Sequence, residues 1–207
     1  VYGGGAGCSK TFSMLLAQTR HYNVPQYKGI VFRRESTQLR MSGGLWDTSK
    51  KIFPHLGAGP RESLLDWTMP SKAHVRLGHL ESEAEMEKVQ HGSQYDRIDF
   101  DELQTFTLKM FLYMLSRNRN PDSGIRPSMS GGCNPTPRGW LKPFIRWWLD
   151  EEGRYADPSK AGLVRFLSRG DNDEFLWADS SEQMCRLYGE TAAKFAKTVT
   201  FIPGKLS

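Results

Sequence analysis

The sequence contains little cysteine, and its spacing does not suit a structural use. Only Cys8, Cys133 and Cys185 occur in 207 residues, without a CxxC pair or a neighbouring histidine. An odd, widely spaced set excludes a disulfide framework and any recognisable zinc knuckle. We therefore expect a protein of a reducing compartment.

Long apolar runs, internal repeats and low-complexity tracts are also missing. No run approaches the ~18 apolar residues of a membrane span, so no membrane partner is expected. Hydrophobic residues make up 38% and charged residues 25% of the chain, as in a soluble globular protein. The length predicts one domain over residues 1–207. Because a glycine-rich loop starts at the third residue and the chain begins with Val1, we expect a fragment truncated at its N-terminus.

Charge is segregated along the chain, although the net charge is only +5. Residues 116–148 hold six basic side chains and one acid, whereas residues 81–102 hold eight acids and two bases. The basic stretch also contains Trp140, Trp147 and Trp148. Such a stretch could follow a phosphate backbone. On composition alone, a solvated surface whose tryptophans are anchored in the core is an equally good interpretation.

Alternating helical and β-rich patterns predict an α/β fold. The first helix is expected over residues 10–21, with Phe12, Leu15, Leu16 and Thr19 on one face. Further helices are expected at 108–116, 139–149 and 191–197. Strands are expected at 30–32, 95–100, 128–133, 163–167 and 198–202, with a β-hairpin formed by 64–69 and 73–77.

A glycine-rich loop opens the first helix and resembles a Walker A phosphate loop. A triphosphate needs inward backbone N–H groups, a helix N-terminus, a lysine for its β- and γ-oxygens and a hydroxyl for Mg²⁺. Ser9 departs from the pattern, in which glycine usually stands at this position. If the position needs a positive φ, a residue other than glycine costs about 1–2 kcal/mol there. The alternative is a flexible glycine turn that only caps the helix. The candidate nucleotide-binding residues are Gly4, Gly5, Ala6, Gly7, Cys8, Ser9, Lys10 and Thr11.

Two acids at the end of the strand near residue 100 resemble a Walker B motif. Ile98 and Phe100 alternate with polar residues, and Asp101 and Glu102 follow them. Asp101 would hold Mg²⁺ through its water shell, as hard oxygen ligands do. Glu102 would orient or deprotonate the attacking water, which favours hydrolysis over transfer to a metabolite. Taken alone, such a pair of acids is more often a solvated turn. Because the pair follows a phosphate loop in the sequence, we favour a catalytic pair instead.

The ordered combination of motifs resembles the ATPase domain of the large terminase subunit, the DNA-packaging motor of tailed phages. The resemblance covers nearly the whole chain. It rests on the two motifs above and on Gly78-His79-Leu80, Val89-Gln90-His91-Gly92, Asp101–Thr107, Leu115–Arg119, Asn134-Pro135, Gly139–Lys142 and Val199–Pro203.

The resemblance implies a P-loop NTPase fold of the ASCE type, with a largely parallel sheet flanked by helices and a β-hairpin insertion. It implies that Lys10 and Thr11 contact phosphate and Mg²⁺, that Asp101 supports the metal and that Glu102 is catalytic. Asn134 stands at the family's coupling motif, where an amide could sense the γ-phosphate. Without the resemblance, an Asn-Pro turn is nearly as probable there.

An arginine is also expected to neutralise the transferred phosphoryl group. The candidates are Arg117, Arg119 and Arg126, whereas Arg33 and Arg34 could face nucleotide or DNA. Any one of them is individually more typical of a surface or ion-pair residue.

The implied function is Mg²⁺-dependent ATP hydrolysis that drives double-stranded DNA into a capsid. The implied partners are duplex DNA bound without sequence preference, other subunits of a homo-oligomeric ring, the portal and the small terminase, in the host cytoplasm. The family's nuclease domain has no counterpart in these residues. Two alternatives stay open: another P-loop enzyme, such as a helicase-like ATPase or a nucleotide kinase, and a non-catalytic nucleic-acid-binding module with a degraded loop.

Overall fold

The computed structural model describes residues 1–4, 9–134, 139–172 and 174–204. The chain divides into two compact units, one over Tyr2–Lys142 and one that joins Val1 to Pro143–Gly204. The expectation of one domain over residues 1–207 stays a prediction, because two compact units can belong to one domain. None of the helices in the described ranges is long and apolar enough to cross a membrane.

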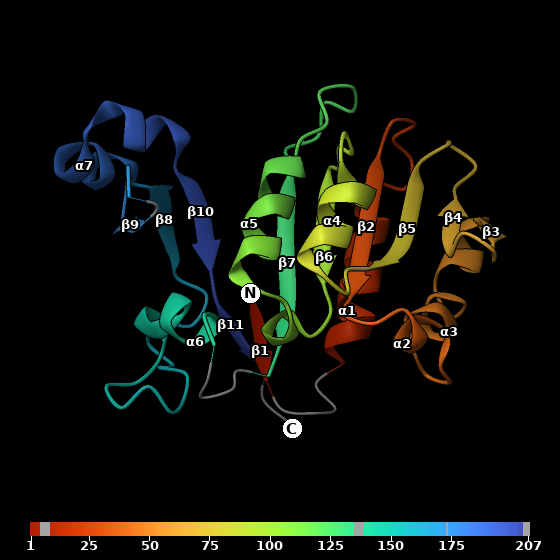
Figure 1. Cartoon of the computed structure of the whole chain (residues 1–207), viewed down its shortest axis with the longest axis horizontal. Coiled ribbons are helices and arrows are strands. Elements are labelled where there is room, and N and C mark those ends of the chain that lie inside the picture. Colours follow the sequence, from red (N-terminus) through yellow and green to blue (C-terminus); the bar gives the residue numbers. More distant parts are fainter. Residues whose placement is uncertain (5–8, 135–138, 173, 205–207) are drawn as a thin grey trace. The chain divides into compact units, whose positions relative to one another are not determined.

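The Tyr2–Lys142 unit is an α/β structure (Figure 1). Its strands are β1 (Tyr2–Gly4), β2 (Lys28–Arg33), β3 (Gly59–Arg61), β4 (Asp66–Thr68), β5 (His74–His79), β6 (Arg97–Phe100) and β7 (Ser128–Cys133). Its helices are α1 (Lys10–Gln18), α2 (Thr37–Arg40), α3 (Leu45–Ser49), α4 (Glu83–Gln90), α5 (Leu108–Arg117) and the 3₁₀ turns η1 (Thr19–His21), η2 (Phe53–Leu56) and η3 (Leu103–Thr105).

The sheet of this unit runs in the order β1-β7-β6-β2-β5-β4-β3. Pairing is parallel from β1 through β7, β6 and β2 to β5. It is antiparallel from β5 through β4 to β3, which confirms the predicted hairpin and adds a strand to it. The largely parallel sheet flanked by helices is therefore confirmed.

Helices cover both faces of the sheet. Successive residues of a strand point to opposite faces, and β6 shows this directly. Asp99 accepts a hydrogen bond from Gln18 of α1, whereas the Phe100 ring lies 6.0 Å from the Phe111 ring of α5. α1 thus covers one face, and α5 covers the other together with α4, which packs against it (Figure 1).

The first helix buries a different face from the one predicted. Met14, Leu15 and Gln18 are buried, whereas Phe12 is 44% and Leu16 is 52% exposed. Gln18 can be buried because its amide donates to the Ile30 carbonyl and to Asp99 and accepts from the Tyr27 hydroxyl. The hydrogen bonds of the Gln18 side chain therefore allow α1 to bury a face that the positions of its apolar residues did not predict.

The Pro143–Gly204 unit contains a small antiparallel sheet in the order β10-β8-β9. The predicted helix over 139–149 was wrong in its extent, because it is broken into a short helix that contains Pro143 and a 3₁₀ turn. The predicted helix at 191–197 is the end of a longer helix with a kink at Gly189, whose φ is 89°. The elements are α6 (Leu141–Phe144), which begins in the first unit, η4 (Arg146–Trp148), β8 (Val164–Arg169), β9 (Phe175–Ala178), α7 (Ser181–Phe195), β10 (Lys197–Thr200) and β11 (Ile202–Gly204).

Candidate nucleotide site

The start of α1 presents two of the predicted site residues at the carboxyl edge of the parallel strands. Ser9 precedes the helix with φ 48° and ψ 28°, and its side chain makes no capping hydrogen bond. Lys10 and Thr11 form the first turn. Gly4 ends β1, whereas Gly5, Ala6, Gly7 and Cys8 lie outside the described residues. Position 9 does adopt a positive φ, and the residue that adopts it is a serine.

Thr11 contacts the first of the two acids. Its hydroxyl Oγ1 lies 3.0 Å from Oδ1 and 3.1 Å from Oδ2 of Asp101. Asp101 directly follows β6, and its backbone N–H donates to the Phe32 carbonyl at 2.8 Å. The parallel pairing of β2 and β6 therefore fixes where this carboxylate lies.

Arg33, the last residue of β2, contacts both acids. Its Nη2 is 3.1 Å from Oδ2 of Asp101 and 3.3 Å from Oε1 of Glu102. Its Nε is buried and has no hydrogen-bond partner in the described part of the chain. Burial raises the pKa of Asp101, and the Arg33 guanidinium, followed by the Thr11 hydroxyl, partly opposes that increase in pKa.

Glu102 has a backbone conformation that a residue with a side chain seldom adopts. Its φ of 62° and ψ of 52° lie in the left-handed region. Its carbonyl accepts from the backbone N–H of Thr105 at 2.9 Å and from the Thr105 hydroxyl at 2.8 Å. The 3₁₀ turn η3 therefore holds the glutamate in this strained conformation, and such strain is frequent at functional sites.

Asn134 follows β7 and lies beside the lysine. Lys10 Nζ donates to Asn134 Oδ1 at 2.8 Å, and the Asn134 N–H donates to the Gln104 side chain at 3.1 Å. Gly131 in β7 explains why small residues precede Asn134: an added Cβ would lie 2.5 Å from the Leu103 side chain. The glycine lets η3, which carries the glutamate's turn, pack directly on β7.

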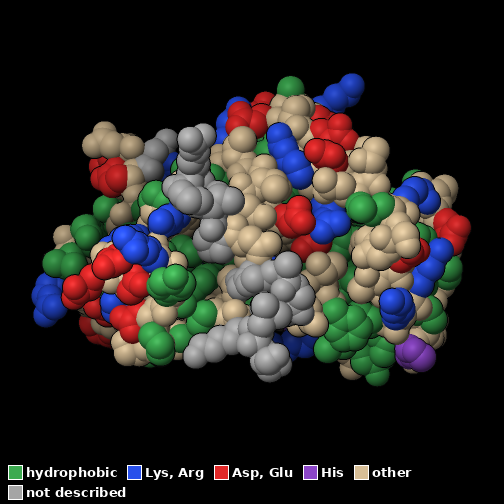
Figure 2. Space-filling view, turned by 90° about the horizontal axis from the view of Figure 1, so that it is seen from below, with side chains coloured by type: hydrophobic (Ala, Val, Ile, Leu, Met, Phe, Trp, Pro, Cys, Tyr) green, Lys and Arg blue, Asp and Glu red, His purple; other side chains and the backbone are tan. Residues whose placement is uncertain are grey.

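The donor types at this edge fit a magnesium–triphosphate. Thr11 offers a hydroxyl and Asp101 a carboxylate within hydrogen-bond distance of each other, and both are hard oxygen donors. Among the described residues, no group of three or more His, Cys, Asp or Glu side chains could hold a metal by itself. This suits Mg²⁺, which keeps most of its ligands as water and phosphate oxygens. Figure 2 looks onto this edge, where acidic and basic side chains lie against one another in the middle of the view.

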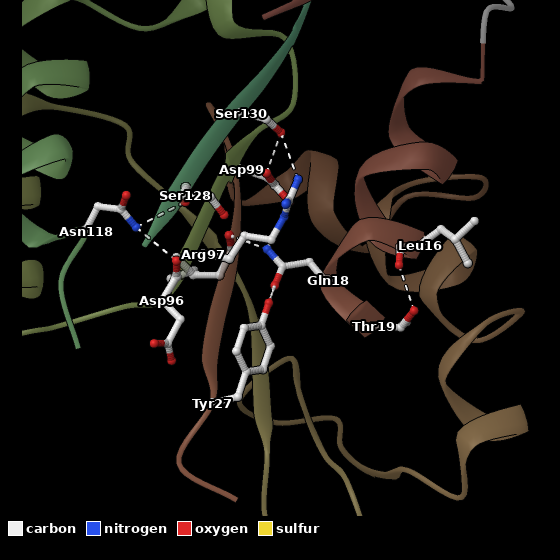
Figure 3. Close-up of polar contacts among 11 residues, drawn as sticks. Leu16, Gln18, Thr19, Tyr27, Asp96, Arg97, Asp99, Asn118, Ser128 and Ser130 are labelled. Carbon is white, nitrogen blue, oxygen red and sulfur yellow. Dashed lines mark hydrogen bonds and ion pairs between the residues drawn. The ribbon is translucent and has the colours of Figure 1, made fainter. Parts of the chain in front are cut away.

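A buried polar network braces the strands behind the site (Figure 3). Asp99 in β6 is fully buried and accepts from Gln18 Nε2 at 3.0 Å, Arg97 Nε at 2.9 Å and Ser130 Oγ at 2.5 Å. Burial raises the pKa of Asp99, and the Arg97 partner opposes this. The network ties α1 to β6 and β7, the elements that carry Lys10, Asp101 and Asn134.

The predicted catalytic arginines lie at the opposite edge of the sheet. The Arg117 carbonyl accepts from the N–H of Tyr95, which precedes β6, and the Arg119 N–H donates to that same Arg117 carbonyl group. β6 spans about 13 Å between this end and Asp101. In Figure 1 the α5–β7 connection lies at the top and the carboxyl ends of β6 and β7 at the bottom. The structure therefore does not bring Arg117 and Arg119 to the acids of their own chain.

Arg34 is also occupied elsewhere, because its Nη1 donates to the Leu80 carbonyl at 2.7 Å. Among the described residues, Arg33 is the arginine that lies at the acids. The signal for it is its position at the carboxyl end of a strand that pairs in parallel with the acidic strand.

Comparisons with known structures agree with this architecture. A large terminase structure from a thermophilic bacteriophage matches with a TM-score of 0.54 at 18% identity, covering 73% of this chain and 38% of that one. A structure of the same phage's large terminase in complex with ADP matches at 0.53 and 16%, with coverages of 73% and 38%. A further crystal form of that terminase matches at 0.52 and 15%, with coverages of 99% and 46%. The chain thus spans less than half the length of these proteins, and no curated protein matches it.

The parallel sheet, the helix that opens at its carboxyl edge and the structural matches define an α/β fold of the P-loop type. A family model described as "Terminase large subunit, T4likevirus-type, N-terminal" matches residues 1–205. The chain therefore belongs to the terminase large subunit family.

Proposed function

We propose that this chain hydrolyses ATP with Mg²⁺ and couples hydrolysis to the movement of double-stranded DNA into a viral capsid. The observation that carries the proposal is the meeting of Lys10, Thr11, Asp101 and Glu102 at one edge of the sheet, although about ninety residues separate the two pairs. Family membership and the ADP complex of the thermophilic phage's large terminase support it.

Each residue at this edge has a role in the proposal. The backbone of residues 4–9 and the Lys10 ammonium bind the phosphates. Thr11 and Asp101 hold Mg²⁺, which supplies charge neutralisation at the phosphate oxygens. Glu102 orients and deprotonates the attacking water. Asn134, hydrogen-bonded to Lys10, is placed to exchange that bond when the γ-phosphate arrives or leaves.

Arg33 keeps the carboxylates of the two acids close to each other. Its guanidinium lies between the carboxylates of Asp101 and Glu102, which would otherwise repel each other. Arg117 and Arg119 have no role at this site within the same chain. A motor that needs a further arginine would receive it from a neighbouring subunit.

The wider setting follows from the family. We propose a homo-oligomeric ring that works with the portal and the small terminase in the host cytoplasm. DNA contact is mainly to phosphates, because a packaging motor has to accept every sequence.

Nucleotide binding by a Lys10→Ala variant tests the proposal first. We expect the affinity for a fluorescent ATP analogue with Mg²⁺ to fall at least ~100-fold, because the phosphates lose a charge-assisted partner. Lys51→Ala removes an exposed lysine elsewhere and should bind as the parent does. Equal affinity in the Lys10 variant would refute the assigned site.

Phosphate release with and without duplex DNA then separates the remaining functions. Free phosphate that appears faster with DNA supports a motor. A phosphorylated acceptor without free phosphate indicates a kinase, and DNA binding without nucleotide binding indicates a non-catalytic module.

A further inference from the structure

An open cleft lies at the amino edge of the sheet, away from the nucleotide site. It has a volume of about 770 Å³ and is lined by Gln94 and by residues 119–121 and 124–127. These residues belong to the connection between α5 and β7 and to the segment just before β6. The lining includes two arginines, Arg119 and Arg126, and no acid.

The two arginines are exposed and form no ion pair with any described residue. Within the described residues, neither guanidinium has a salt bridge or a side-chain hydrogen bond, unlike Arg33, Arg61 and Arg97. Asp122 is the one acid between them in the sequence, and it makes no salt bridge to either in the same described ranges. Two positive charges therefore face solvent at the cleft.

Asn118 holds the start of the connection firmly. Its side-chain amide Nδ2 donates to the carbonyls of Tyr95 at 3.2 Å, Asp96 at 3.2 Å and Ser128 at 3.1 Å. Figure 3 shows this amide between the segments that lead into β6 and β7. The segment that carries Arg119 is thus fixed to both strands.

Asp96 fixes the middle of the connection between α5 and β7 through hydrogen bonds. This fully buried carboxylate accepts at Oδ2 from the Lys28 N–H and from Asn120 Nδ2, both at 2.8 Å, and at Oδ1 from the Ser123 hydroxyl. Ile125 also packs against the hydrophobic core. These neutral donors hold the connection in a fixed frame, and among the described residues Asp96 forms no salt bridge with Arg119 or Arg126.

We propose that this cleft binds the backbone phosphates of duplex DNA. Guanidinium groups are well suited to phosphate oxygens, and the neutral amides of Gln94 and Asn120 complete a lining without acids. The lining contains no aromatic side chain on which a base could stack, so contact is to the backbone and independent of sequence. The choice of DNA rests on the proposed packaging function; the anion site itself does not.

The test compares DNA binding by the parent chain, an Arg119→Ala/Arg126→Ala variant and a charge-matched control. Fluorescence anisotropy with a labelled duplex, without nucleotide, is measured across a salt series. Each lost phosphate contact should lower the slope of log K against log salt by about 0.9 and weaken binding roughly eightfold at 0.1 M salt. The control, Arg154→Ala/Arg186→Ala, removes the same charge from two exposed arginines of the other unit and should keep the parent's slope.

A lysine pair, Arg119→Lys/Arg126→Lys, separates a role in binding from a role in folding. It keeps the charge and should keep the salt slope, with thermal unfolding confirming that all variants are folded. An alanine variant that binds DNA as the parent does would overturn the proposal. The proposal would also be overturned if the alanine variant lost binding to polyglutamate but kept its binding to DNA, because this would indicate an acidic protein partner. Mg²⁺-ATP binding, measured without DNA, should be unchanged in every variant, so failure of the proposed hydrolysis is recognised separately.

Discussion

The two edges of the Tyr2–Lys142 sheet handle charge in opposite ways. At the carboxyl edge, Arg33 contacts Asp101 and Glu102, and Lys10 contacts Asn134. At the amino edge, Arg119 and Arg126 line a cleft without an ion pair among the described residues. Paired charges keep reacting groups in a fixed geometry, whereas unpaired charges on a rigid frame attract an anion. The contrast supports our proposals of chemistry at the first edge and DNA contact at the second.

Both edges depend on a buried aspartate of the same strand. Asp99 joins β6 to α1 and β7 behind the acids, and Asp96, three residues earlier, fixes the connection that carries the arginines. One short strand therefore supports the two proposed sites, one at each of its ends. Changes at either end should be separable, and a change in the middle should affect both.

The largest separable effect is expected at Glu102. Glu102→Gln removes the base but keeps the shape of the side chain, so ATP turnover should fall roughly 10²- to 10⁴-fold. ATP affinity and duplex DNA affinity should be unchanged, because the cleft lies at the other edge. Steady-state phosphate release, equilibrium nucleotide binding and anisotropy measure the three quantities.

A matched change for this comparison is Glu152→Gln, which alters an exposed glutamate of the other unit and should hydrolyse ATP at the parent's rate. A Glu102→Gln chain that turns over as fast as the parent removes the assigned base. If its DNA affinity falls in parallel with turnover, the two edges are not independent.

Asp99→Ala should impair both edges together. It leaves the partly buried Arg97 without its carboxylate and removes the acceptor of Gln18 and Ser130, so the free energy of unfolding should fall by about 3–5 kcal/mol. Urea denaturation measures this loss. Asp99→Asn keeps an acceptor oxygen and should lose less; equal stability of the alanine variant and the parent would contradict the role given to the network.

The smallest effect is expected at Ser9, which takes a left-handed conformation without a capping hydrogen bond. Ser9→Gly should raise the free energy of unfolding by about 1 kcal/mol, because glycine adopts positive φ without strain. Ser13→Gly, the same change inside α1, should lower it by roughly 0.5–1 kcal/mol. The melting temperatures of the two variants should shift in opposite directions from that of the parent. Shifts of the same sign would show that backbone strain at position 9 does not determine the effect of Ser9→Gly on stability.

Local patterns were sufficient for the elements that are apolar and bounded by turn residues. β7 has the bounds that were predicted, and β2, β6 and α5 differ by one or two residues. The buried face of α1 was missed because Gln18 is satisfied by three partners that are distant in sequence. The extent of α7 was missed because Gly189 interrupts its pattern.

The candidate site divides in the same way. Lys10, Thr11, Asp101 and Glu102 could be placed together from sequence, because parallel strands bring their carboxyl ends to one edge; their roles stay predictions. Arg117 and Arg119 lie at the other end of the sheet, because position in the sequence does not say which end of the sheet a connection occupies; a role for them stays a prediction. The same edge argument, applied to β2, identifies Arg33.

The contacts at the carboxyl edge also set the terms of ligand entry. The Lys10 ammonium donates to Asn134 and the Thr11 hydroxyl donates to Asp101, so an incoming molecule competes with these internal partners. A small anion can compete for the ammonium only, and a lone cation for the carboxylate only. We therefore expect a polyphosphate chelate, which can contact both groups at once, to bind more tightly than either ion alone.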